Sequence, residues 1–193
     1  MTYILLAIVV VLGFWVVSVY NFFVTSKTRV GAAIQEIGNQ LKRQSELIPN
    51  LVTSAKGYLE HEKGIFSELT AARKSISSAV DSGSLTQMAD AGKQLADVLP
   101  KIQVVVESNP EIKGSEVVKS LMDDLRDTSD KVMYARRLLI DLTADYNVKR
   151  VTFPSNLVAD MFHFETLKGL ETPDSGDSLK VTEGEMKTPK VSL

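Results

Sequence analysis

The sequence contains no cysteine among its 193 residues. Disulfides, thiolate metal sites, a cysteine nucleophile and the lipid-modified cysteine of a lipoprotein are therefore excluded. Histidine is nearly as scarce, with two residues in the chain. His61-Glu62 could begin a zinc-protease motif, but that motif needs a second histidine at position 65, which is isoleucine. The sequence therefore predicts no metal site and no other cofactor.

Neither sign of charge is in large excess, since the formal net charge is −2. No chain-wide basic field argues for nucleic acid as a partner. The sequence also lacks a phosphate-binding loop, a glycine elbow around a serine and a Ser-x-x-Lys box. We therefore expect a protein that is not an enzyme, with no small-molecule substrate.

The sequence does contain a long apolar run, from Ile4 to Val24. About 20 such residues cross the hydrocarbon core of a bilayer as a helix. A cleaved signal peptide is the alternative, but no Lys or Arg precedes the run and no small-x-small cleavage site follows it. The run is predicted to be a transmembrane anchor, residues 4–24.

Basic residues flank the run on one side, because Lys27, Arg29, Lys42 and Arg43 all follow it. The positive-inside rule then places the N-terminus outside and the rest of the chain in the cytoplasm. The expected arrangement is a single crossing of the membrane.

A hydrophobic stripe with alternating spacings of four and three begins after the run. Such spacing keeps every position on one face of a helix. Because the phase does not slip at Pro49, we expect Pro49 to lie inside a helix that continues to about Val80; a helix start at Pro49 is the alternative. The stripe comprises Val30, Ile34, Ile37, Leu41, Gln44, Ile48, Leu51, Ala55, Tyr58, Glu62, Ile65, Leu69, Ala72 and Ile76.

Two further helical patterns follow, over residues 85–105 and 116–146, with turn chemistry at Asp81–Ser84 and a helix start at Ser115. No window alternates like a strand. From residue 171 the composition cannot form a core, which predicts a disordered tail, residues 171–193. The predicted fold is all-α: a transmembrane helix continuing into a long antiparallel helical bundle, residues 27–168, with a disordered C-terminal tail.

Polar residues interrupt the stripe at Gln44 and Glu62, and Asn50 lies beside Pro49. A buried polar layer fixes helix register at some cost in stability, and Arg73 and Arg136 are candidate partners. Asp123, Asp124, Asp127 and Asp130 also lie close together in sequence, and we interpret them as a solvated acidic surface rather than a cation site.

The first helix is longer than the two that follow. If those two lie side by side, its membrane-proximal end stays uncovered, and an exposed apolar strip there would bind another molecule. This reasoning predicts an interaction surface for self-association, or for another membrane protein, at Val30, Ile34, Ile37 and Leu41. Alternatively, the two helices lie end to end and cover the whole first helix.

Ordered motifs from about residue 20 to 165 resemble the LemA family of membrane-anchored bacterial helical proteins. There are departures: Gly38 replaces an Asp, Gln44 replaces an Arg, and Leu139-Ile140 replaces a Tyr-Asn pair. The chain is therefore identified as a divergent member. The motifs are Leu41-Lys42-Arg43, Leu47-Ile48-Pro49-Asn50-Leu51-Val52, Gly57-Tyr58 with His61-Glu62, Tyr20-Asn21, Arg29-Val30, Ala72-Arg73, Asn109-Pro110, Ala135-Arg136, Tyr146-Asn147, Phe153-Pro154 with Asn156, and Phe162 with Phe164.

This resemblance implies an anchored, coiled-coil-like bundle in the bacterial inner membrane. In some members the roles concern membrane remodelling, and in others membrane metalloproteases and envelope stress. Together with the missing catalytic motifs, it predicts a non-catalytic scaffold or adaptor of the cell envelope that acts through helix–helix contacts and self-assembly as a homo-oligomer. A regulatory subunit of a membrane enzyme, such as a metalloprotease, and a signal-transducing membrane protein are the alternatives.

Overall fold

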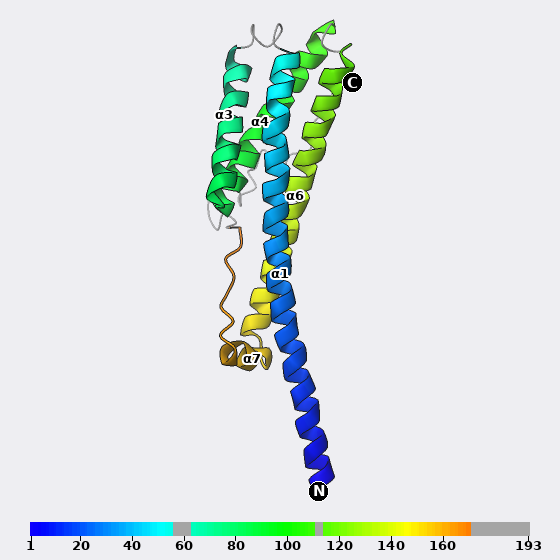
Figure 1. Ribbon diagram of the computed structural model, residues 1–193, viewed down its shortest axis with the longest axis vertical. Helices are drawn as coiled ribbons and strands as arrows, with labels where there is room; N and C mark the ends of the chain where they lie inside the picture. The colour runs from blue at the N-terminus through cyan, green and yellow to red at the C-terminus, as the bar shows by residue number, and fades with distance from the viewer. Residues whose placement is uncertain (56–62, 111–113, 171–193) are drawn as a thin grey trace, which may run out of the picture.

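The structure, a computed structural model, describes residues 1–55, 63–110 and 114–170 (Figure 1). These residues form helices and no strand, which confirms the all-α prediction. The predicted tail, residues 171–193, lies outside the described residues. The helices are α1 (Thr2–Ser54), α3 (Lys63–Ser82), α4 (Leu85–Ser108), α6 (Glu116–Val151) and α7 (Ser155–Met161).

The first helix, α1, joins the apolar run to the bundle without a break. It passes through Pro49, as predicted, and ends at Ser54. A proline in a helix removes one backbone donor, yet the helix continues because its apolar face is held by packing on both sides of Pro49. Ile48 and Leu51, which flank it, are both in the core.

The prediction that this helix continues to about Val80 is wrong. α1 ends at Ser54, and α3 runs back beside it in the opposite direction (Figure 1). The stripe nevertheless keeps its phase, because Leu69, Ala72 and Ile76 of α3 enter the same core as Leu51 of α1. Periodicity reports which side of a helix faces the core and does not report a reversal of chain direction.

Successive long helices alternate in direction, so α1, α3, α4 and α6 form an antiparallel four-helix bundle (Figure 1). The turn between α3 and α4 places Gly83 at φ 66°, a conformation that glycine adopts without a steric penalty. Ser84 caps α4 by accepting a hydrogen bond from the Gln87 N–H, and Ser115 caps α6 through the Val118 N–H. The turn and start signals in the sequence are therefore confirmed.

The predicted uncovered strip on α1 is covered. Val30, Ile37 and Leu41 are 5%, 1% and 0% exposed, and Ile34 packs partly buried against the same core. α6 is the reason, because it lies antiparallel along α1 from the upper end of the bundle down to Tyr146, which packs on Phe23. The prediction of exposure is wrong, and these four side chains are core residues.

Below the α3–α4 hairpin, the chain after α7 supplies a third element beside α1 and α6. This segment, residues 164–170, runs up the bundle without regular secondary structure (Figure 1). The Asn147 side chain holds it in place by donating to the Leu167 carbonyl and accepting from the Leu167 N–H, both at 2.9 Å. Leu167 and Leu170 pack against the main core and close its lower part.

Candidate membrane-proximal site and polar layer

The N-terminal part of α1 projects beyond the bundle and exposes large apolar side chains (Figure 1). Phe14 is 75% exposed, although a ring of this size is normally buried. Among the described residues, this is the one helix long and apolar enough to cross a membrane. The exposed members are Tyr3, Ile4, Leu5, Leu6, Ile8, Val9, Val10, Val11, Leu12, Phe14 and Val17.

The base of this projection is packed by a second, smaller core. Phe23 is fully buried, stacked on Phe164 with centroids 4.9 Å apart and edge-on to Tyr146 at 5.2 Å. Val158 and Ala159 of α7 complete the cluster with Val19. Burial raises the pKa of the Tyr146 phenol, opposed by the nearby Arg150 charge. The last turns of the apolar run are therefore fixed to the bundle by aromatic packing.

A tight corner between α6 and α7 brings α7 against the anchor. The Ser155 hydroxyl lies 2.7 Å from the Lys149 carbonyl oxygen and 2.8 Å from the Thr152 carbonyl oxygen. It therefore donates a hydrogen bond to the backbone at the end of α6. Arg150 forms an ion pair with Asp160 at 2.7 Å and also donates to the Phe164 carbonyl. These contacts join α6, α7 and the segment after α7 into one unit.

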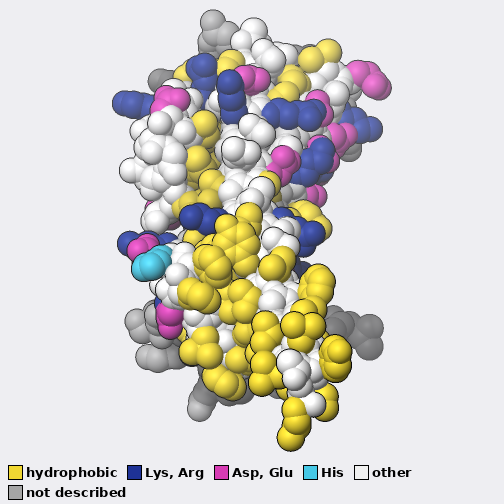
Figure 2. Space-filling view, turned by 60° about the horizontal axis from the view of Figure 1, so that its bottom comes forward, with side chains coloured by type: hydrophobic (Ala, Val, Ile, Leu, Met, Phe, Trp, Pro, Cys, Tyr) yellow, Lys and Arg dark blue, Asp and Glu magenta, His cyan; other side chains and the backbone are white. Residues whose placement is uncertain are grey.

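Large apolar side chains are exposed around this corner. We call this set the corner surface. Figure 2 shows apolar side chains gathered over the whole lower part of the molecule. Lys149, whose ammonium lies 5.7 Å from the centre of the Phe22 ring, lies at its edge. The corner surface comprises Val148, Val151, Phe153, Leu157, Met161 and Phe162.

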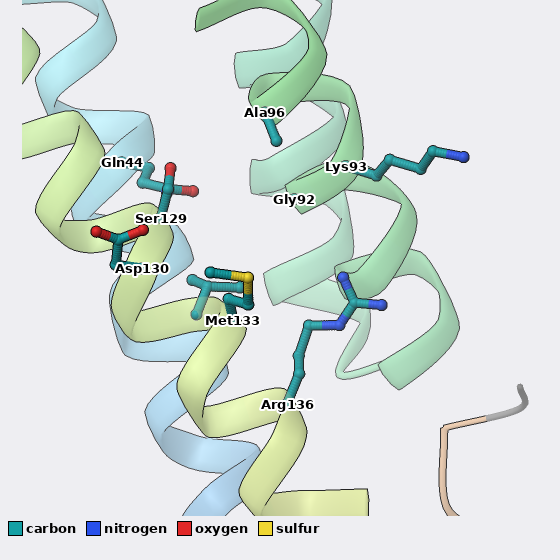
Figure 3. Close-up of a pocket in the computed structure, with 9 residues that line it drawn as sticks. Gln44, Gly92, Lys93, Ala96, Ser129, Asp130, Met133 and Arg136 are labelled. Atoms are coloured by element: carbon teal, nitrogen blue, oxygen red, sulfur yellow. The ribbon is translucent and has the colours of Figure 1, made fainter. Parts of the chain in front are cut away.

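The predicted polar layer is only partly assembled. Gln44 is buried and donates to the Ser129 hydroxyl at 2.9 Å, while its Oε1 atom has no partner among the described residues. Gln44 and Ser129 line a cleft of about 290 Å³. Arg136 is half-buried and lines this cleft as well, extending from α6 toward α4 (Figure 3). Asn50 is exposed and takes no part in this layer. Glu62 lies outside the described residues.

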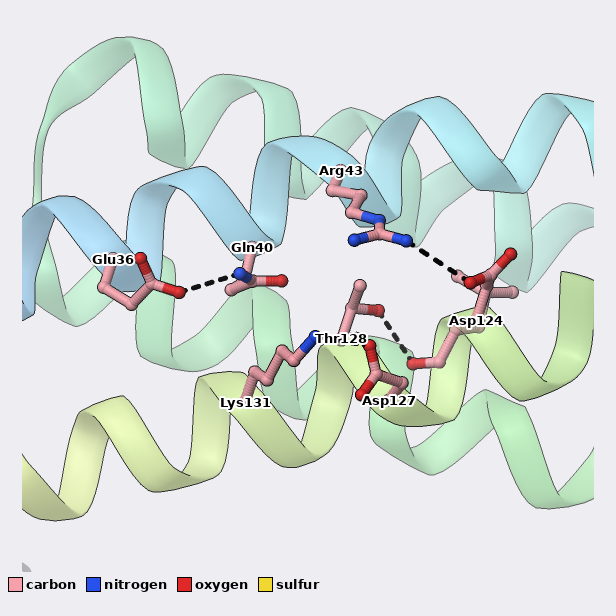
Figure 4. A network of polar contacts seen from close by, with 8 residues as sticks. Glu36, Gln40, Arg43, Asp124, Asp127, Thr128 and Lys131 are labelled. Atoms are coloured by element: carbon pink, nitrogen blue, oxygen red, sulfur yellow. Dashed lines mark hydrogen bonds and ion pairs between the residues drawn. The ribbon is translucent and has the colours of Figure 1, made fainter.

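Of the four clustered acidic residues of α6, Asp124 lies at the seam between α1 and α6. Asp124 pairs with Arg43 of α1 at 3.3 Å, and Asp127 pairs with Lys131 at 2.7 Å (Figure 4). Asp123 lies 3.9 Å from Arg126, and Asp130 is exposed. Within the described ranges, no group of three or more acidic or histidine side chains is arranged to hold a metal ion. Half-exposed pairs of this kind contribute little to stability.

Sequence reasoning missed the contact between the anchor and the α6–α7 corner. Tyr20, Phe22 and Phe23 end the apolar run, and Phe162 and Phe164 follow α7. Seven phenylalanines occur in the whole chain, so their concentration at these two places was the available signal. It could have predicted that the two places meet.

An exposed apolar helix continuous with a helical bundle is the architecture of a membrane-associated protein. The LemA family profile matches residues 33–183, so the chain belongs to the LemA family. It is 25% identical over 186 residues to "Magnetosome protein MamQ" of Magnetospirillum gryphiswaldense, an alignment covering 84% of this chain and 68% of that protein. Two proteins of Paramagnetospirillum magneticum, "Magnetosome protein MamQ 1" and "Magnetosome protein MamQ 2", are each 23% identical over 188 residues, with the same coverage.

Proposed function

We propose that this protein is a non-catalytic, membrane-anchored scaffold of the bacterial cell envelope. The observation that carries the proposal is the continuity of α1, which runs from the exposed apolar segment into the centre of the bundle. Because the base of the anchor is also packed by Phe23, Phe164 and Tyr146, no flexible linker separates the two parts. Every copy therefore presents its bundle at the same height and orientation above the membrane, which suits a protein that organises contacts.

The proposed topology places the bundle in the cytoplasm, with the anchor crossing the inner membrane. Lys27 and Arg29 follow the apolar run directly and are exposed. Lys149 and Arg150 lie at the same end of the bundle, where α6 meets the anchor. Basic residues near a membrane-spanning segment favour the cytoplasmic side. Fusions after Leu193 test this: a reporter active only outside the cytoplasm should stay silent.

The proposed contact surface for self-assembly is a shallow, mostly apolar groove between α1 and α6, of about 420 Å³. Ala32 and Ala33 form one wall, and Tyr134 and Leu138 form the other. Tyr134 is 71% exposed, which is unusual for so large a ring. A second copy is the proposed occupant, because copies anchored in one membrane hold their grooves at one height and at raised effective concentration. As the proposed contact surface, this groove takes the place of the strip at Val30, because Val30 is a buried core residue.

Co-purification from native membranes tests the scaffold role. Two differently tagged full-length copies are expressed together, crosslinked in the membrane and extracted in detergent. We expect each tag to retrieve the other copy. Recovery of each tagged copy alone, without the other copy or a further membrane protein, would overturn the proposal.

A further inference from the structure

The apolar run of α1 continues into the part of the helix that packs on the bundle. Val19 and Phe23 are covered by α7 and by the end of α6. A hydrocarbon core is about 30 Å thick. The full run, residues 4–24, reaches about 31 Å and matches it.

The helix α7 lies level with the C-terminal part of this run. The Tyr20 ring meets Phe162 with centroids 4.9 Å apart and Phe164 at 5.6 Å. Because Tyr20 belongs to the apolar run that ends at Val24, Phe162 lies at the depth of that run. If residues 4–24 cross the membrane, then α7 lies within the outer part of the same leaflet.

The exposed side chains of the corner surface are apolar, as a position in the outer part of a leaflet requires. Phe153 is 76% exposed and Leu157 is 58% exposed. Figure 2 shows apolar side chains gathered over the lower part of the molecule. Lys and Arg side chains border the apolar region in that view. Apolar side chains in the acyl region with basic groups at the phosphate level are typical of interfacial helices.

Two opposite charges at this corner, one on α6 and one on α7, form an ion pair. Asp160 of α7 is paired with Arg150 at 2.7 Å. The Lys149 ammonium lies over the Phe22 ring at the edge of the corner surface, from which a long side chain can reach the phosphates. An unpaired carboxylate in the acyl region would oppose insertion, and pairing lowers that cost.

We propose that the α6–α7 corner is a second membrane-binding element. It inserts the corner surface into the leaflet on the same side of the membrane as the bundle. The occupant of this surface is lipid. The inference rests on the proposed anchoring, and it adds that the bundle is seated in the bilayer rather than held above it on a stalk. The base of the bundle then displaces lipid asymmetrically around each anchor.

Single-cysteine labelling of the full-length protein tests this, because the chain has no native cysteine. Leu157→Cys and Met161→Cys place an environment-sensitive fluorophore on the corner surface. Val117→Cys is the matched control, since Val117 is 59% exposed, close to Leu157, but lies at the opposite end of α6. Val9→Cys reports the anchor itself. Each labelled protein is reconstituted in vesicles of phosphatidylethanolamine and phosphatidylglycerol, with and without spin-labelled lipids as quenchers.

We expect the probes at residues 157 and 161 to emit at shorter wavelength than the probe at 117. Spin-labelled lipid should quench more than half of their fluorescence and leave the probe at 117 unchanged. A water-like, unquenched signal at 157 and 161, with the probe at 9 quenched, overturns this inference and leaves the anchoring intact. A blue-shifted but unquenched signal also overturns it and identifies a protein contact instead. An unquenched probe at 9 means that the proposed anchoring itself has failed.

Discussion

The ring of Phe23 meets the ring of Tyr146 edge to face, with centroids 5.2 Å apart and planes at 77°. Phe23 belongs to the apolar run of α1, and Tyr146 lies near the end of α6, so this pair joins the anchor to the bundle. Edge-to-face pairs add stability beyond the area that they bury. Both rings are closed off from solvent by α7 and by the segment after it.

Phe23→Ala should lower the free energy of unfolding by about 3 kcal/mol, because it opens a cavity in a fully packed cluster. Thermal unfolding of the full-length protein in detergent, followed by circular dichroism, measures the change. Phe14→Ala is the matched control on the same helix, since Phe14 is 75% exposed and should leave the transition unchanged. Equal effects of the two substitutions would contradict the packing described.

Gln44→Leu should raise the free energy of unfolding by about 1 kcal/mol, because the buried Gln44 Oε1 atom has no partner and a leucine restores an unbroken apolar face. Ser129, which loses its donor, is half-buried and can be solvated from the cleft. Chemical denaturation in detergent measures the difference. A clear loss of stability would instead mean that the Gln44–Ser129 hydrogen bond is a net contributor to the fold.

Stability should fall above pH 10, and Tyr146 should account for part of the loss. Burial raises the pKa of the Tyr146 phenol in the folded protein above that of an unfolded tyrosine, about 10. The folded state thus favours the protonated phenol. Its contribution is complete below the unfolded pKa and is lost as the pH rises through the folded pKa. Melting temperatures measured across this range should fall less steeply for Tyr146→Phe than for the native protein.

Tyr134→Gln combined with Leu138→Ser should reduce crosslinked dimers in native membranes, if the groove between α1 and α6 is the contact between copies. Both residues are at least 39% exposed, so the bundle should keep its melting temperature. Val104→Gln combined with Val117→Ser changes two exposed apolar residues elsewhere and serves as the control. Unchanged dimers in the first variant would reject the groove and leave the anchored bundle intact.

Local patterns in the sequence determined most of the helical structure. The length of the apolar run predicted the exposed helix, and the spacing of four and three predicted which side of α1 enters the core. Ser115 and the turn at Gly83 marked helix ends through side-chain capping and positive φ, which are local effects. The phase through Pro49 correctly predicted that the helix continues there.

Long-range packing decided the rest. Whether the stripe lies on one helix or on two antiparallel helices does not change its phase, so the reversal between Ser54 and Lys63 left no mark on the periodicity. Val30 and Ile37 are core because α6 extends down to Tyr146, a choice among pairings that local spacing does not encode. The same holds for α7, because seven residues carry too little periodicity to fix a partner. The packing of Val158, Ala159 and Phe164 around Phe23 placed this helix beside the apolar run of α1.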